Sequence, residues 1–281
     1  MKYFYIFFIF IFGLIFGSFI NALEWRLHQK EEAELNKINL DNSLSIVNGR
    51  SVCPNCRHQL NALDLIPLVS YLLLRRKCRY CRKKISWQYP IVELLTALTF
   101  VIFYLFWPYS LVSASGIFLL IISLLILIGL IALFIYDLKW YILPSSIIYV
   151  LFGLVFIYKI LFYFTIDQNF SSLVVGSLVG LLIGGGLFYL TFILSKGEWI
   201  GGGDVRLGAL LGFFLGGPIN SLIFLFLASF IGSLYSIVLL LTKKANRKTL
   251  IPFGPFLILG AILVQLFSWH FRLFIHDIFI Y

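Results

Sequence analysis

The sequence predicts an all-α polytopic membrane protein with about eight transmembrane helices and a small cytoplasmic zinc-binding lobe between the first and the second. Of its 281 residues 61% are hydrophobic and only 12% are charged, whereas soluble domains carry roughly 25% charged residues. Several apolar runs reach about 20 residues, the length that crosses a bilayer core. All four cysteines fall in the one long polar stretch between such runs.

The first apolar run, 3–23, is expected to be a retained transmembrane helix. A signal peptide is disfavoured because only Lys2 precedes the run and no small-residue cleavage site follows it. The other candidate spans are 91–107, 111–136, 145–164, 172–194, 205–217, 219–241 and 251–269. At about 1.5 Å per residue, the 205–217 stretch is too short for an upright crossing. We therefore expect it to be tilted or partly re-entrant, with a cavity at its start.

The positive charges predict the orientation of the chain. When the spans alternate, 19 of the 22 Lys and Arg residues fall on one face, 12 of them within 24–90. By the positive-inside rule this face is cytoplasmic and the N-terminus lies outside. The three exceptions are Lys2, Lys159 and Arg272. The net charge of +10 is thus a topology signal, and no nucleic-acid partner is expected because no aromatic-interleaved basic module is present.

The cysteines form two C-x-x-C pairs, Cys53 with Cys56 and Cys78 with Cys81, with 21 residues between the pairs. Two such pairs are typical of a tetrahedral structural Zn²⁺ site. The alternatives are two disulfides, which a reducing cytosol disfavours, or four unliganded thiols. A bound metal would stabilise a lobe that is too small to fold on its own core.

Two aspartates are expected at the same depth, near the cytoplasmic ends of different spans. Asp137 ends the apolar run LLILIGLIALFIY, and Asp204 follows Gly201, Gly202 and Gly203. A carboxylate at a helix centre costs about 2.5–3.5 kcal/mol, and less near an interface. Two carboxylates at matching depth indicate a shared purpose.

Such a pair can share one proton, since two like charges in close contact cannot both ionise easily. One carboxylate then takes a proton from water while the other donates a hydrogen bond to the scissile carbonyl, which is peptide hydrolysis by general acid–base catalysis. The glycines would let an extended substrate approach Asp204 closely. The alternative is that Asp137 and Asp204 cap helices or pair with Lys139 and Arg206.

Six motifs in order resemble the bacterial prepilin peptidases, GxGD-type aspartic membrane proteases also called type IV leader peptidases. The motifs are GSFINALEWRL (17–27), CPNC…CRYC, YPIVELLTAL (89–98), DLKWYILP (137–144), GGGDVRLG (201–208) and IPFGPFLILGA (251–261). The resemblance covers nearly the whole chain. Two departures are Ser145, where many members carry another aspartate, and the long polar stretch 28–50, which we expect to be a solvated loop.

The resemblance implies an endopeptidase of the bacterial cytoplasmic (inner) membrane, with Asp137 and Asp204 as catalytic pair facing the cytoplasm. It would cleave the basic leader of type IV prepilins or pseudopilins after a glycine. Many members then methylate the new N-terminus with S-adenosylmethionine, an activity associated with the cysteine lobe. The implied parts are the first transmembrane helix (1–23), the cysteine and methyltransferase lobe (24–90) and the peptidase domain (91–281). Membrane lipid is the other expected partner.

Two other functions remain open from the sequence. A proton- or cation-coupled transporter could use Asp137 and Asp204 as a relay, with 205–217 as a broken helix. No obvious internal repeat of the kind common in transporters supports that reading. Alternatively, a membrane assembly factor could dock partner proteins on the cysteine lobe, with both aspartates structural. Neither the client prepilin nor the oligomeric state follows from the sequence.

Overall fold

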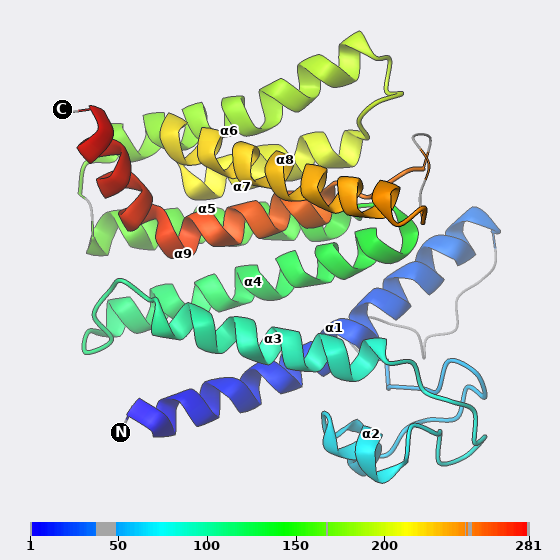
Figure 1. Ribbon diagram of the computed structural model, residues 1–281. Helices are drawn as coiled ribbons and strands as arrows, with labels where there is room; N and C mark the ends of the chain where they lie inside the picture. Colours follow the sequence, from blue (N-terminus) through cyan, green and yellow to red (C-terminus); the bar gives the residue numbers. More distant parts are fainter. Residues whose placement is uncertain (1, 38–48, 167, 245, 247–248, 280–281) are drawn as a thin grey trace. The chain divides into compact units, whose positions relative to one another are not determined.

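The computed structural model describes residues 2–37, 49–166, 168–244, 246 and 249–279, with side chains from Tyr3 to Phe267. All regular secondary structure in the described part is helical, apart from two isolated β-bridges (Figure 1). Its contacts divide it into two compact units, Met1–Leu105 and Phe106–Tyr281, called unit 1 and unit 2 below.

Each of the eight predicted spans corresponds to a helix, which confirms the all-α membrane fold. The helices are α1 (Lys2–Leu35), α3 (Gln88–Leu105), α4 (Ala114–Trp140), α5 (Ser145–Thr165), α6 (Phe170–Leu194), α7 (Gly202–Leu215), α8 (Pro218–Leu241) and α9 (Gly254–Phe279). Among the described residues, six of these helices are long and apolar enough to cross a membrane, by length and composition. The exceptions are α7, with 14 residues, and α9, whose described apolar stretch is Gly254–Phe267.

The breaks between the helices of unit 2 follow from local backbone chemistry. Tyr141 ends α4 in the left-handed conformation, with φ 57° and ψ 31°, and its N–H donates to the carbonyl oxygen of Asp137 at 2.9 Å. Between α7 and α8, Gly216 and Gly217 have φ of 65° and 75°, which favours glycine. Pro218 then begins α8 at a position where its missing N–H costs nothing.

Unit 1 contains α1, the short 3-10 helix η2 (Ala62–Leu65), the short helix α2 (Val69–Leu73) and α3. Glycines bring α1 and α3 into close contact: a Cβ on Gly17 would lie 2.5 Å from the Cα of Glu93. Glu93 itself is buried, and its Oε2 accepts the N–H of Leu68 at 2.8 Å. This carboxylate therefore joins the cysteine lobe to α3 instead of extending to the membrane surface.

The prediction of a solvated loop at 28–50 is wrong for its first residues, because α1 continues to Leu35. Side chains one turn apart stabilise this polar extension. His28 lies 3.3 Å from Glu32, and Lys30 lies 3.7 Å from Glu34. Pairs at this spacing contribute about 0.2–0.5 kcal/mol each. Residues 38–48 of the stretch lie outside the described part.

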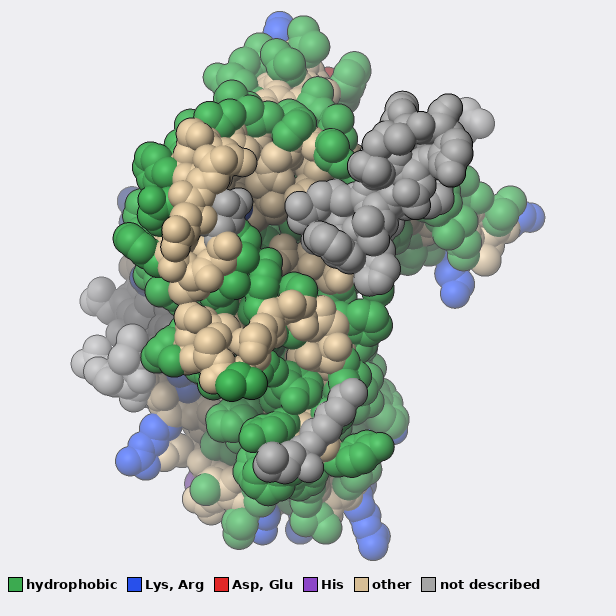
Figure 2. Space-filling view, turned by 90° about the vertical axis from the view of Figure 1, so that its left-hand side faces the viewer, with side chains coloured by type: hydrophobic (Ala, Val, Ile, Leu, Met, Phe, Trp, Pro, Cys, Tyr) green, Lys and Arg blue, Asp and Glu red, His purple; other side chains and the backbone are tan. Residues whose placement is uncertain are grey.

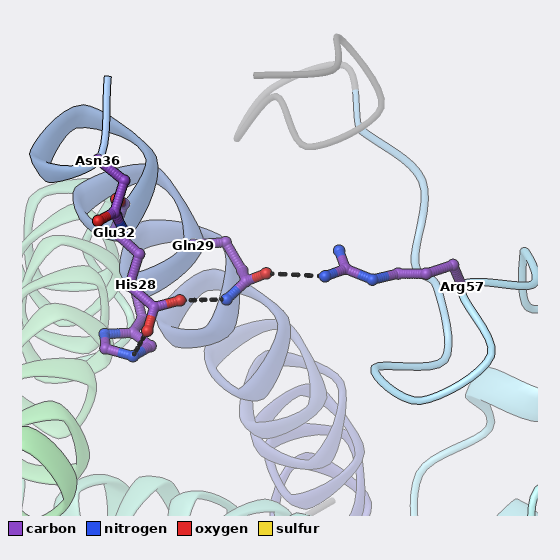
Figure 3. A network of polar contacts seen from close by, with 5 residues as sticks. All are labelled: His28, Gln29, Glu32, Asn36 and Arg57. Atoms are coloured by element: carbon purple, nitrogen blue, oxygen red, sulfur yellow. Dashed lines mark hydrogen bonds and ion pairs between the residues drawn. The ribbon is translucent and has the colours of Figure 1, made fainter. Parts of the chain in front are cut away.

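The polar end of α1 is also tied to the cysteine lobe (Figure 3). Gln29 donates to Glu32 at 2.8 Å and accepts a hydrogen bond from Arg57 at 3.1 Å. Asn36 donates to the backbone carbonyl of Glu32 at 2.9 Å. The lobe is thus connected to α1 through this exposed network and to α3 through Glu93.

Unit 2 is built around the close pairing of α6 with α7. A Cβ on Gly184 or Gly208 would overlap the backbone carbonyl of the other residue, and Gly180 and Gly212 face one another in the same way. Small residues at i and i+4 let helix backbones approach this closely within a membrane. The core beside this pair includes the buried side chains of Leu207, Leu211, Leu257 and Ile148. Many large hydrophobic side chains of the helices are exposed, and the face drawn in Figure 2 shows hydrophobic side chains over much of its described surface, as expected for helices that face lipid.

Candidate active site and metal centre

The four cysteines of unit 1 come together as the sequence predicts. Their Sγ atoms all lie within 4.8 Å of one another, and Cys53 and Cys78 are buried. Such a group of four sulfur ligands could hold a metal ion.

The two C-x-x-C pairs adopt the same local structure. The N–H of Cys53 donates to the carbonyl of His58, and the N–H of Cys78 donates to the carbonyl of Lys83, both at 2.9 Å. The residue after each second cysteine, Arg57 or Arg82, has a positive φ. The sequence therefore folds each pair into a tight turn that directs both thiols to one side.

The chemistry of the thiols suits a metal better than it suits disulfides. All four thiols are free, and Cys53 Sγ lies 3.9 Å from Cys81 Sγ, so the disulfide alternative is wrong for this structure. The backbone N–H of Lys83 and then the side-chain amide of Asn55 lower the pKa of Cys81 to about 6. Thiolates are the form of cysteine that binds metal.

In unit 2 the two predicted aspartates line one cavity of about 1060 Å³, called the aspartate cavity below. Asp137 reaches it from the C-terminal end of α4, and Asp204 from the first turn of α7. The volume matches the upper end of ordinary ligand pockets, about 300–1,000 Å³.

Asp137 is held by the beginning of α9. It is buried, and its Oδ2 accepts the backbone N–H of Gly254 at 3.1 Å. A Cβ on Gly254 would lie 2.6 Å from the same oxygen, so a larger residue would displace the carboxylate. The N-terminus of a helix favours a negative charge at this place.

Asp204 occupies the third position of α7, after the N-cap Gly201, and its carboxylate accepts a backbone hydrogen bond from Gly201. This is the position from which an acidic side chain reaches back to cap its own helix. Asp204 remains partly exposed. Capping therefore occupies only part of its hydrogen-bonding capacity, and the carboxylate still faces the cavity.

The three glycines before Asp204 are not equivalent. Gly201 and Gly203 line the aspartate cavity, whereas Gly202 does not. A Cβ on Gly203 would lie 3.0 Å from the Cβ of Leu143, which packs between the starts of α7 and α9. Gly201 has an ordinary φ of −74°. The close packing of Leu143 against Gly203 therefore explains why a glycine stands at 203. The backbone conformation of Gly201 does not require a glycine.

The alternative, in which the aspartates pair with Lys139 and Arg206, does not occur in the described part. Arg206 donates to the backbone carbonyl of Gly202 at 3.1 Å and to the hydroxyl of Ser145. Lys139 lies over the ring of Trp140, with Nζ 4.2 Å from the centroid. Asp137 and Asp204 form no ion pair with described residues, so both remain available for chemistry.

Sequence reasoning missed several residues of the cavity. Gly254 belongs to a quoted motif, yet its contact with Asp137 spans 117 residues of chain. Glu198 and the α8 residues Ser229, Ser233 and Ser236 also line the cavity. The spacing of the three serines on one face of α8 is the signal that could have pointed to them.

Comparisons with known proteins match two family models to this chain. The model of the Bacterial Peptidase A24 N-terminal domain matches residues 11–107, and that of the Type IV leader peptidase family matches residues 124–237. The second match includes both Asp137 and Asp204, and the first includes all four cysteines. No solved structure gave a significant match.

Curated relatives match along most of their own length. A type 4 prepilin-like proteins leader peptide-processing enzyme of Escherichia coli O78:H11 is 35% identical over 262 residues, 89% of each chain. A prepilin leader peptidase/N-methyltransferase of Bacillus subtilis is 32% identical, over 92% of this chain and 93% of the relative. One from Vibrio cholerae is also 32% identical, over 94% and 97%. The chain therefore belongs to the type IV leader peptidase family.

Proposed function

We propose that Asp137 and Asp204 are the catalytic pair with which this peptidase removes the basic leader of type IV prepilins or pseudopilins. The carrying observation is that Asp137 of α4 and Asp204 of α7 line one cavity. The names of the relatives, which describe prepilin leader peptidases, support the substrate class.

The proposed mechanism needs one proton shared by the two carboxyl groups. The ionised carboxylate accepts a proton from the attacking water, and the protonated partner donates a hydrogen bond to the scissile carbonyl oxygen. The N–H of Gly254 orients Asp137, and the backbone of Gly201 orients Asp204. Fixed orientation of this kind lowers the barrier because the groups need not reorganise during the reaction.

The remaining cavity residues suggest how a prepilin would be seated. Gly201 and Gly203 would let the extended peptide around the scissile bond, which follows a glycine in the substrate, approach Asp204. Glu198 lies exposed at the same cavity and would attract a basic leader. The serines of α8 offer hydroxyl groups to the backbone of the bound peptide.

The cysteine lobe is proposed to hold Zn²⁺ through Cys53, Cys56, Cys78 and Cys81. In that role the metal is structural, since four protein ligands leave no open position. We propose that the lobe at 24–90 methylates the new N-terminus with S-adenosylmethionine. This proposal follows the names of the relatives, which include N-methyltransferase. The peptidase chemistry is assigned to residues 91–281, and 1–23 to the first transmembrane helix.

The chain is a multi-pass membrane protein, and we propose that it lies in the cytoplasmic (inner) membrane with its N-terminus outside. The distribution of positive charge supports this orientation. The aspartate cavity and the cysteine lobe would then both face the cytoplasm, where basic leaders remain before cleavage. Membrane lipid surrounds the helices, and no nucleic-acid partner is expected.

Purified full-length protein and a synthetic prepilin with a basic leader test the proposal. Asp137→Asn and Asp204→Asn should each abolish cleavage, while Glu34→Gln, at an exposed carboxylate of α1, should not. Mass spectrometry of the product locates the cut and detects any added methyl group. Substantial cleavage by either aspartate variant would rule out the pair.

The transporter alternative receives no support, since both matching family models describe peptidases. The assembly-factor alternative predicts that Asp137→Asn and Asp204→Asn leave the protein functional. The cleavage assay therefore separates it from the peptidase.

A further inference from the structure

A second cavity in unit 2, of about 340 Å³, contains a lysine that the peptidase chemistry does not use. Lys159, on α5, is one of the three positive charges that do not follow the topology rule of the sequence. Leu215 and Gly216, at the end of α7, line this Lys159 cavity, whereas Asp204, at the beginning of α7, lines the aspartate cavity. The two cavities thus lie at opposite ends of one short helix.

The length of α7 places the Lys159 cavity below the outer surface of the bilayer. Fourteen residues span about 21 Å, against a hydrocarbon core of about 30 Å. If the aspartate cavity opens at the cytoplasmic face, the other end of α7 is still within the outer half of the membrane. An ionisable side chain at such depth is costly and requires a partner.

Two hydrogen-bond donors converge in this cavity without a partner. Lys159 forms no hydrogen bond or ion pair with any described residue. Ser177, only 4% exposed, has a buried hydroxyl with no hydrogen-bond partner among the described residues. Lys159 Nζ and Ser177 Oγ lie 3.0 Å and 3.9 Å from the point where a Cβ on Gly216 would sit. A side chain at Gly216 would fill the space between them.

The surroundings of the two donors favour a negative ligand. Asn220 donates its side-chain amide to the carbonyls of Leu215 and Gly216, each at 3.2 Å, and so satisfies acceptors at the end of α7. The first turns of α6 and α8 both line the cavity, and helix N-termini attract anions. No described carboxylate lines it.

The Lys159 cavity also opens to the surface of the helices. Ser172, Pro218 and Ile219 line it and are exposed. The volume lies within the usual range for ligand sites, about 300–1,000 Å³. A molecule already in the outer leaflet could therefore enter it from the side.

We propose that the Lys159 cavity binds the phosphate of an anionic lipid headgroup from the outer leaflet. The ammonium of Lys159 supplies the counter-charge, and the hydroxyl of Ser177 donates a hydrogen bond. The bound headgroup fills the space beside Gly216, at the junction of α7 and α8.

Native mass spectrometry of the full-length protein in detergent, titrated with phosphatidylglycerol or zwitterionic phosphatidylcholine, tests the site. Wild type should bind a first phosphatidylglycerol more tightly than phosphatidylcholine. Lys159→Met should weaken that first binding by about tenfold or more, the size expected for a hydrogen bond to a charged group. Ser177→Ala should weaken it by less, and Lys159→Arg should keep most of it.

Lys243→Met is the matched control, because it removes the same charge from an exposed position at the other end of α8. It should leave the first binding unchanged. If Lys159→Met fails to fold, two other measurements test the site. Ser177→Ala should still weaken the first binding of phosphatidylglycerol, and phosphatidylglycerol should raise the melting temperature of wild type more than phosphatidylcholine does.

Equal binding of both lipids, or equal effects of Lys159→Met and Lys243→Met, would overturn the proposal. Excess inorganic phosphate provides a further arm. Little displacement of the lipid supports a lipid headgroup as ligand. Lys159-dependent binding of inorganic phosphate without Lys159-dependent lipid binding would show a free-anion site and overturn the lipid assignment.

Discussion

Unit 2 positions its two aspartates through helices that are distant in sequence, whereas unit 1 positions its four thiols through two short turns. Asp137 depends on the start of α9, 117 residues away, and Asp204 depends on the packing of α7 against α6. Each cysteine pair is closed by hydrogen bonds within six residues. The aspartate site should therefore depend on helix packing, and the cysteine lobe on the metal that we propose for it.

Removal of the metal should give the largest difference between the units. With Cys53→Ser and Cys78→Ser combined, we expect about one zinc per chain to be lost and the lobe to unfold, since structural zinc contributes roughly 10–16 kcal/mol in small domains. Hydrogen exchange should rise across 50–85, while the helices of unit 2 stay protected. Elemental analysis and exchange mass spectrometry measure both effects.

Asn55→Ala is the control for this experiment, because it removes a hydrogen bond to Cys81 but keeps all four thiols. It should retain the zinc. A native protein that holds no metal, or exchange that rises equally in both units, would refute this view of the lobe.

Disturbing the α6–α7 contact should affect unit 2 and leave the cysteine lobe of unit 1 unchanged. Gly184→Leu would place a side chain against the backbone of Gly208, and overpacking of this kind typically costs about 1–3 kcal/mol. We expect a lower melting temperature and slower prepilin cleavage, with the zinc content unchanged. Thermal unfolding, a cleavage assay and elemental analysis report the three quantities.

Gly186→Leu is the matched control on the same helix, because nothing lies within 4 Å of a Cβ at Gly186. It should resemble wild type. Similar losses in both variants would show that the close glycine contact does not position α7.

The smallest expected effect concerns Ser145, which accepts a hydrogen bond from Arg206. Ser145→Ala should cost about 0.5–1.5 kcal/mol of stability, the net value of one hydrogen bond. Cleavage should change only slightly, since Arg206 forms no ion pair with either aspartate in the described part. Ser146→Ala, at an exposed neighbour, should be neutral. A severe loss of cleavage in Ser145→Ala alone would make this pair part of the active site.

Much of the fold could be predicted because a membrane helix is recognisable from the apolar run in its own sequence. Each of the eight apolar runs coincides with a helix, and six of these helices are long and apolar enough to cross a membrane in the described part. The C-x-x-C pairs located a cluster of thiols that two tight turns create. The extension of α1 to Leu35 was not predicted, because hydropathy marks only the apolar part of a helix. Beyond the membrane surface the helix continues on its polar residues, which form pairs such as Lys30 with Glu34.

The sequence predicted the two aspartates of the site and the glycines before Asp204, two of which line the cavity. Asp137 and Asp204 stand out because carboxylates are rare in apolar segments. The N–H of Gly254 carries no such signal, since only tertiary packing brings it to the cavity. The spacing of the α8 serines shows that they share one face of a helix, but not that this face lines the cavity. Likewise, Lys159 was visible as a misplaced charge, but the unpaired hydroxyl of Ser177 beside it was not.

Single-turnover cleavage of a synthetic prepilin by Asp137→Asn, Asp204→Asn and the double variant tests the central claim most directly. If the two carboxylates act as one unit on one water, each single change should slow cleavage by about 10²–10⁴-fold. The double variant should then be no slower than the worse single variant. A single variant that cleaves at the wild-type rate, or a double variant whose loss is the product of the two single losses, would contradict a joint role.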